Sequence, residues 1–429
     1  MGKFKILIIL AVSIAVILAV CLTVVVVFSS LAGRQKSNAF NDSDLIPTRV
    51  EVTLESNAFW TLLKATNELY WPESSGRKLD DLSDDTNWDD SLAADVLEKN
   101  HDCLNLFDEA MRQPFLLVPE PKTFADEYSY LGGWKAVSRV ESIRVFASFR
   151  GKNEKEAFDS AFKIIEFGQR VENSGGLIIH YVVGSAIKAV GLRRIQQMIP
   201  QTTLPETDLV ELIHRLNDFK ANKEGITNAL KMEYQMDREL LDNYAAGRIS
   251  TTNSDSDQKV TSFGLKMLFN ATKTKREFAQ ADRVLRDNIS KPFSEIPWTD
   301  LPVIETNTPI WRRLIGGNAI GDIIFALMEP SLKGFASRKS RENVDIAATQ
   351  LLLALKIYKI HHGKLPESLS ELVPECFSQV PADDFDGKPF RYSPEKQLIY
   401  SVGSDLKDSG GEARRGNLES YDLPFKIEF

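Results

Sequence analysis

The sequence predicts an α+β protein that is predominantly α-helical, with a transmembrane helix at its N-terminus and a small sheet-bearing module at its C-terminus. Three observations predict this: a long apolar run near the N-terminus, helical spacing of apolar residues over most of the chain, and two short β-type segments near its end. A chain of 429 residues also exceeds the about 250 to 300 residues at which a single core stops growing. We therefore expect a membrane anchor (1–33), a linker (34–47), an α-helical domain (48–333) and a C-terminal module (334–429).

The apolar run covers residues 6–28 and contains no charged side chain. At about 1.5 Å per residue it can span a hydrocarbon core about 30 Å thick. A cleaved secretory signal is the alternative, because Ser30 and Ala32 are small residues of the kind that precede a cleavage site. The apolar part of such a signal is normally only about 7 to 15 residues long. We expect an uncleaved single-pass anchor.

Only five residues precede this run, which favours an N-terminus in the cytoplasm and a large extracytoplasmic, periplasmic part. The basic residues on its two sides are nearly balanced and add little to this orientation. A net charge of −8 argues against a nucleic-acid partner. The partners we expect are the lipid bilayer, through residues 6–28, and other proteins of the cell envelope.

The central part of the chain carries apolar residues at helical spacing, separated by turn and capping signals. Short connections between consecutive helices predict helical hairpins, as in a solenoid-like stack or an irregular bundle. The glycine pairs at Gly132 and at Gly316 are predicted to be tight turns. The expected helices are 57–70, 92–111, 153–175, 177–199, 207–216, 223–244, 265–289 and 320–328, the last one ending at Pro330.

The C-terminal module begins with an amphipathic helix, residues 344–362, which Gly363 and Pro366 terminate. A short turn and helix follow at residues 365–374, and residues 390–392 and 398–402 are predicted to be strands. Between them, an Asx-type turn at Asp386 is expected to set up the hairpin, with Phe385 packed beneath it.

The segments HHGKLPESLSELVP, DDFDGKPFRY and LIYSVGSDLKDSGGE, in this order, resemble the globular domain of major, G-type pseudopilins of type II secretion. The resemblance covers about a fifth of the chain and implies an exported protein with a role in assembly. It does not extend to the N-terminus, where the membrane run has Ser13 and Cys21 and lacks both the processing site and the glutamate of that family. We therefore do not expect a processed filament subunit.

The loop at residues 403–412 carries three carboxylates, Asp405, Asp408 and Glu412, on a glycine-bearing turn, which suits calcium. In the major pseudopilins the corresponding loop holds a structural calcium ion, so the resemblance implies the same ion here, with Asp405 and then Asp408 as ligands. Arg414 and Arg415 depart from the family, which has further acidic residues there, and their charge opposes a cation. The alternative is a solvated loop closed by an arginine–carboxylate pair.

No catalytic or cofactor-binding residue can be named from the sequence, because it contains no HExxH, CxxC, GxSxG, GxGxxG or P-loop motif. The acidic stretch 80–90 fits a calcium loop only in its first half and is predicted to be an acidic surface loop. His180 and His214 are predicted to be structural. His361 and His362 lie at the end of the module helix, where an imidazolium suits the negative end of the helix dipole. Nothing in the sequence supports a disulfide between Cys103 and Cys376.

The function expected from these observations is that of a membrane-anchored envelope protein that binds or assembles with other proteins. Two alternatives remain open. One is an envelope hydrolase with carboxylate acid and base residues in the helical domain, and the other is a component associated with a secretion system.

Overall fold

The computed structural model describes residues 40–71, 76–121, 128–246, 269–302, 318–413 and 422–429. No helix in these ranges has the length and apolar character needed to cross a bilayer. The anchor predicted at residues 6–28 lies outside the described residues, and so does the glycine pair at Gly316.

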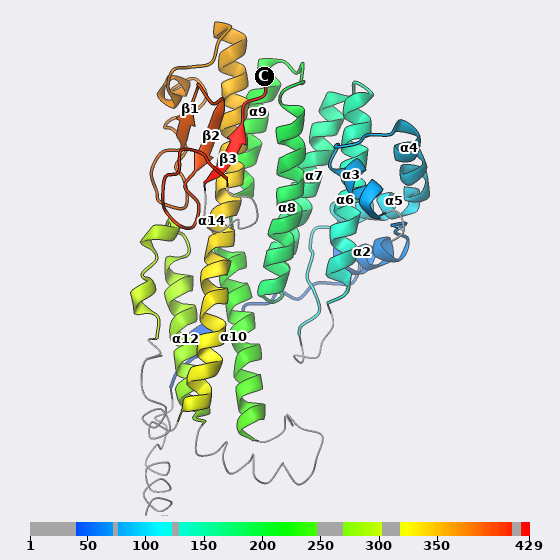
Figure 1. Cartoon of the computed structure of the whole chain (residues 1–429). Coiled ribbons are helices and arrows are strands. Elements are labelled where there is room, and N and C mark those ends of the chain that lie inside the picture. Colours follow the sequence, from blue (N-terminus) through cyan, green and yellow to red (C-terminus); the bar gives the residue numbers. More distant parts are fainter. Residues whose placement is uncertain (1–39, 72–75, 122–127, 247–268, 303–317, 414–421) are drawn as a thin grey trace, which may run out of the picture. The chain divides into compact units, whose positions relative to one another are not determined.

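The described residues form a predominantly helical protein with a small antiparallel sheet near the C-terminus, which confirms the predicted fold class at this level (Figure 1). The helices are α2 (Ala58–Asn67), α3 (Gly76–Ser83), α4 (Asp90–Lys99), α5 (His101–Arg112), α6 (Tyr130–Arg150), α7 (Glu154–Glu172), α8 (Ile178–Met198), α9 (Glu206–Leu216), α10 (Lys223–Ala245), α12 (Ala271–Asn288) and α14 (Ala319–His362). Short 3₁₀ helices are η1 (Ser43–Leu45), η3 (Asn217–Phe219), η4 (Phe293–Glu295), η5 (Trp298–Asp300) and η6 (Leu369–Leu372).

The chain divides into two compact units. The smaller one consists of Met1–Leu45, Asp237–Ala281 and Thr299–Ser331, and the larger one of Ile46–Met236, Asp282–Trp298 and Leu332–Phe429. The sites described below lie within the larger unit.

Helices α7 and α8 form the predicted hairpin and lie side by side in the larger unit (Figure 1). Their close approach depends on two glycines. A Cβ atom added at Gly184 would lie 2.5 Å from the carbonyl oxygen of Gly168, and one added at Gly168 would lie 2.6 Å from the carbonyl oxygen of Gly184. Side chains at these positions would force the two backbones apart.

One hydrophobic cluster runs through the larger unit and includes both helical and sheet residues. Phe162 of α7 and Ile195 of α8 belong to it, and so do Leu372, Ile399 and Phe425 of the C-terminal segment. The three strands lie beside the C-terminal part of α14 (Figure 1). The sheet and the helical hairpins are therefore built around a common core.

The sheet has the order β1 (Arg391–Ser393), β2 (Leu398–Ser401) and β3 (Leu423–Lys426), with neighbours antiparallel. The hairpin of β1 and β2 was predicted, and β3 was not. The expected Asx-type turn is present, because the Lys388 backbone N–H donates to Asp386 Oδ1 at 3.1 Å. Phe385 is buried, as expected.

Three local predictions were wrong. The helix expected to end at Pro330 continues through it, so that α14 is one helix of 44 residues. Proline removes the backbone N–H that would donate to the Ala326 carbonyl oxygen, and the helix continues without this one hydrogen bond. The single helix expected at 92–111 is divided at Asn100, whose side chain accepts from the Tyr70 backbone N–H at 2.8 Å and donates to its carbonyl oxygen at 3.0 Å.

The third wrong prediction concerns Gly132 and Gly133, which lie in the first turn of α6 and not in a tight turn. The reason for a glycine at 133 is contact between helices. A Cβ atom there would lie 2.0 Å from Cγ2 of Thr66 in α2.

Candidate functional site

The structure places the predicted calcium ligands on the loop after β2 but directs them to protein groups. Asp405 Oδ1 accepts from the Lys407 backbone N–H at 3.2 Å. Asp408 Oδ1 accepts from the Gly410 backbone N–H at 3.0 Å and from the Tyr400 hydroxyl at 3.1 Å. Glu412 is exposed.

A fourth carboxylate of this loop, Asp422, was missed by the sequence analysis. Its Oδ2 accepts from the backbone N–H groups of Ser409 at 2.9 Å and Gly411 at 2.7 Å. Its Oδ1 is buried and has no hydrogen-bond partner among the described residues. Burial raises the pKa of Asp422, and the negative charges of Asp408 and Asp405 raise it further. A buried carboxylate oxygen without a partner, beside two other carboxylates, fits a cation.

Two basic side chains bind oxygen atoms of the same loop and so compete with a cation for them. Arg391 Nε lies 3.8 Å from Asp408 Oδ2, and Lys396 Nζ donates to the Gly410 carbonyl oxygen at 2.7 Å. Arg414 and Arg415 lie outside the described residues. The calcium site stays a prediction, with Asp422 as an added candidate ligand.

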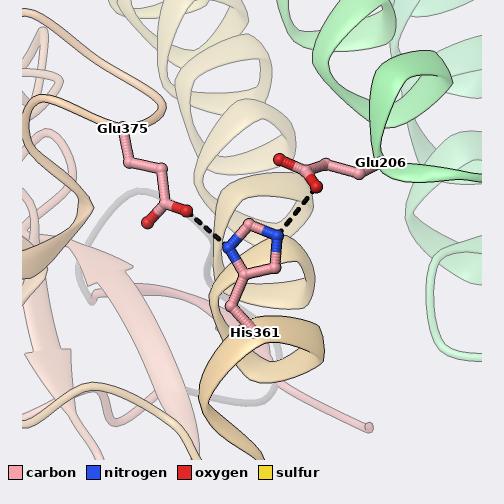
Figure 2. Close-up of side chains that lie close together, drawn as sticks. All are labelled: Glu206, His361 and Glu375. Atoms are coloured by element: carbon pink, nitrogen blue, oxygen red, sulfur yellow. Dashed lines mark hydrogen bonds and ion pairs between the residues drawn. The ribbon is translucent and has the colours of Figure 1, made fainter.

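A second cluster lies at the surface and joins three segments distant in sequence (Figure 2). Among the described residues, Glu206, His361 and Glu375 are the one group of three histidine, cysteine or acidic side chains whose ligand atoms all lie within 4.8 Å of one another. His361 Nδ1 is 2.5 Å from Glu375 Oε1, and His361 Nε2 is 2.7 Å from Glu206 Oε2. Figure 2 shows the imidazole ring between the two carboxylates.

The elements that carry these side chains explain the charge of the cluster. His361 lies in the last turn of α14, where the helix dipole favours a cation, and Glu206 is the first residue of α9, where the dipole favours an anion. Hydrogen bonds with Glu206 and then Glu375 raise the pKa of His361. Because each ring nitrogen faces a carboxylate oxygen, the arrangement favours a ring with hydrogen on both nitrogens, an imidazolium.

A doubly protonated ring and a bound metal ion exclude each other at His361. A metal ion needs the lone pair of a ring nitrogen, and in an imidazolium both nitrogens are donors. From the sequence, His361 was expected only to be a cation at a helix end. Its contact with Glu206 spans 155 residues, and no local pattern could have revealed it.

A third charged cluster is sealed inside the larger unit. Lys188 Nζ lies 2.6 Å from Glu172 Oε2 and 2.5 Å from Glu342 Oε1, and the side chains of Lys188 and Glu172 have no exposed surface. The Tyr181 hydroxyl donates to Glu342 Oε2 at 2.7 Å. Burial raises the pKa of Glu172 well above its usual range, and the charge of Glu342 adds to this shift. With one lysine between two carboxylates, the raised pKa of Glu172 favours its neutral form.

The remaining residues singled out from the sequence have structural environments. His180 is buried as predicted, with Nε2 2.6 Å from the Tyr130 hydroxyl, and burial lowers its pKa to about 4. The cysteines are free thiols within the described part of the chain. The acidic stretch was predicted to be a loop, but its residues 80–83 belong to α3. Arginines hold the stretch: Asp80 by Arg139 at 2.9 Å, Asp84 by Arg194 at 2.5 Å and Asp85 by Arg150 at 2.7 Å.

A groove with a volume of about 580 Å³ lies between α9 with η3, α14, and residues 376–384. Its lining is mixed, with Ile213 and Phe377 beside the amide side chains of Asn217 and Gln350. Asp384 is the one carboxylate among the described lining residues, and Lys339 Nζ binds its Oδ2 at 2.8 Å.

In comparisons with known proteins, the chain matches no family model, no curated protein and no solved structure.

Proposed function

We propose that this chain is a membrane-anchored protein of the cell envelope, with its body outside the cytoplasm, that acts by binding other envelope proteins. The anchor rests on the uncharged run at residues 6–28. The C-terminal order of long helix, short 3₁₀ helix and antiparallel sheet supports the proposed likeness to major pseudopilins. The hairpin of α7 and α8 supports a body of stacked helical hairpins.

The observation that carries the binding role is the groove between α9, α14 and residues 376–384. Its walls come from the helical body and from the pseudopilin-like segment together, and they combine apolar side chains with amide groups. Such a surface suits a polypeptide, whose backbone needs both donors and acceptors.

The hydrolase alternative requires two carboxylates that a substrate can reach. The groove offers Asp384 alone, and Lys339 neutralises it. Glu172 and Glu342 do converge, but they are buried around Lys188 and out of reach of a substrate. Within the groove, these contacts favour binding over catalysis.

Location is tested by fusing alkaline phosphatase or green fluorescent protein after Phe429 of the full chain. We expect an active phosphatase and a dark fluorescent protein, because the C-terminus lies outside the cytoplasm. The opposite pattern would refute the proposed orientation.

Binding is tested by placing a photoreactive amino acid at Gln379 in the groove, with Glu395 in the β1–β2 turn as the matched exposed control. A discrete adduct with an envelope protein from Gln379, absent from Glu395, is the expected result. Equal adducts from both positions, or none from either, would contradict a docking role for the groove.

A further inference from the structure

We propose that His361 is a proton-operated clasp that holds residues 375–380 against α9 and thereby sets the width of the groove. The inference concerns the geometry of the groove and does not depend on which partner, if any, binds there.

The position of the clasp follows from its neighbours in sequence. Glu375 immediately precedes Cys376, Phe377, Ser378 and Gln379, which form one wall of the groove. Glu206 begins α9, whose later residues Ile213 and His214 form the facing wall. His361 bonds to both glutamates, at 2.5 Å and 2.7 Å, so a single ring joins the two walls at one end.

The clasp needs both ring hydrogens. When the ring loses one of them, one nitrogen presents a lone pair to a carboxylate oxygen, and that contact becomes repulsive. Residues 375–380 are then held only by their other contacts. The hydrogen bonds with Glu206 and Glu375 raise the pKa of His361, because both carboxylates stabilise the charged ring.

The other titratable groups at this corner are engaged with one another. Tyr358 donates to Glu371 at 2.5 Å. The ring of His362 stacks on that of Tyr358, with centroids 4.0 Å apart, and its Nδ1 lies 3.0 Å from the Tyr358 carbonyl oxygen. Glu206 of α9 and Glu375 of the loop after η6 are therefore the groups that control His361. His362, adjacent in sequence but outside the pair of carboxylates, serves as a matched control.

The test uses the full chain in detergent, as wild type, His361→Gln and His362→Gln, with hydrogen exchange of residues 375–380 followed from pH 6 to pH 9. After correction for the intrinsic rate, we expect wild-type protection of this segment to fall as pH rises through the raised pKa of His361. His361→Gln is expected to lack protection throughout, and His362→Gln to follow the wild type. Identical protection in wild type and His361→Gln at every pH would overturn the proposal.

Two further measurements test the role of Glu206 and distinguish a proton from a metal ion at His361. Glu206→Gln removes one of the two charges, and we expect the pH at which protection is lost to move down. An unchanged midpoint would overturn the role of Glu206. Zn²⁺ is added as the metal probe at pH 7.5. A rise in Tm with Zn²⁺ that His361→Gln abolishes would replace the proton clasp by a metal site, and no Zn²⁺-dependent rise supports the clasp.

Discussion

At the scale of single residues, the buried cluster around Lys188 shows how charge is accommodated in the core. The ammonium group donates to Glu172, Glu342 and the Phe219 carbonyl oxygen. Three donors meet three acceptors, so the lysine is fully satisfied although it has no exposed surface. Removing the lysine leaves two carboxylates facing each other without a cation.

We expect Lys188→Met to destabilise the larger unit by about 3 to 5 kcal/mol, because breaking a buried ion pair leaves an uncompensated charge. Glu172→Gln is the matched change, since glutamine has the shape of the neutral acid that the structure favours, and we expect its cost to stay within about 1 kcal/mol. Urea unfolding at pH 7 measures both. Equal losses for the two variants would show that Glu172 is ionised in the folded protein.

The raised pKa of Glu172 also predicts that the free energy of unfolding depends on pH. The pKa of Glu172 is raised in the folded state, so its proton stabilises the fold fully below the unfolded pKa, near 4.5, and this contribution is lost as pH rises toward the folded pKa. We expect the stability difference between wild type and Glu172→Gln to shift in favour of the variant over that range. Denaturation curves from pH 4.5 upward test this, and a constant difference would contradict it.

At the scale of elements, the contact of α7 with α8 depends on backbone approach and not on large side chains. Gly184→Ala would place a Cβ atom 2.5 Å from the Gly168 carbonyl oxygen. We expect a loss of about 1 to 3 kcal/mol, the usual cost of an oversized core residue. Gly132→Ala is the control, because no described atom lies within 4 Å of the added Cβ. Alanine is there expected to stabilise α6 by up to about 1 kcal/mol. Thermal unfolding that ranks the two variants the other way would contradict this packing.

The loop between β2 and β3 carries the calcium prediction. If calcium binds there, it satisfies the free Oδ1 of Asp422, and we expect added calcium to raise Tm and EDTA to lower it. Asp422→Asn should abolish the response, whereas Glu395→Gln, in the adjacent β1–β2 turn, should leave it intact. If neither calcium nor EDTA changes Tm, calcium does not bind this loop, and protein groups such as Lys396 and Arg391 hold it.

Elements that depend on local signals were predictable from the sequence. The α7–α8 hairpin follows from its glycines and helical spacing, and the β1–β2 hairpin from its turn residues. Strand β3 was missed because it is four residues long, contains Pro424 and gains its regularity by pairing with β2. Pro330 was misjudged as a helix end, because local propensity does not include the tertiary packing that keeps a long helix intact.

The candidate site shows the same limit. The sequence pointed to the loop of Asp405 but could not reveal Asp422, which reaches that loop only after the chain returns as β3. His361 was identified only as a residue at a helix end. Its two partners come from α9 and from the segment after η6, and only folding brings them together.

At the scale of the whole molecule, the question is whether the cysteines stay free thiols or form a disulfide, which depends on how oxidising the compartment is. Burial raises the pKa of Cys103 to about 12 and that of Cys376 to about 11, so neither thiol ionises readily at neutral pH. We expect an unchanged Tm with and without dithiothreitol, and very slow labelling by a maleimide in the folded state. A mass lower by two hydrogens, restored by reduction, would instead demonstrate a disulfide.

The common core of the helical hairpins and the C-terminal sheet has a consequence for the order of events during synthesis. Phe162 and Ile195 are made early, whereas Leu372, Ile399 and Phe425, which complete their cluster, are made much later. Non-local contacts form only after the intervening chain exists, so the larger unit cannot close until the residues of the C-terminal sheet have been made. Such late closure would keep the chain open enough to pass through a membrane channel, as the export that we propose would require.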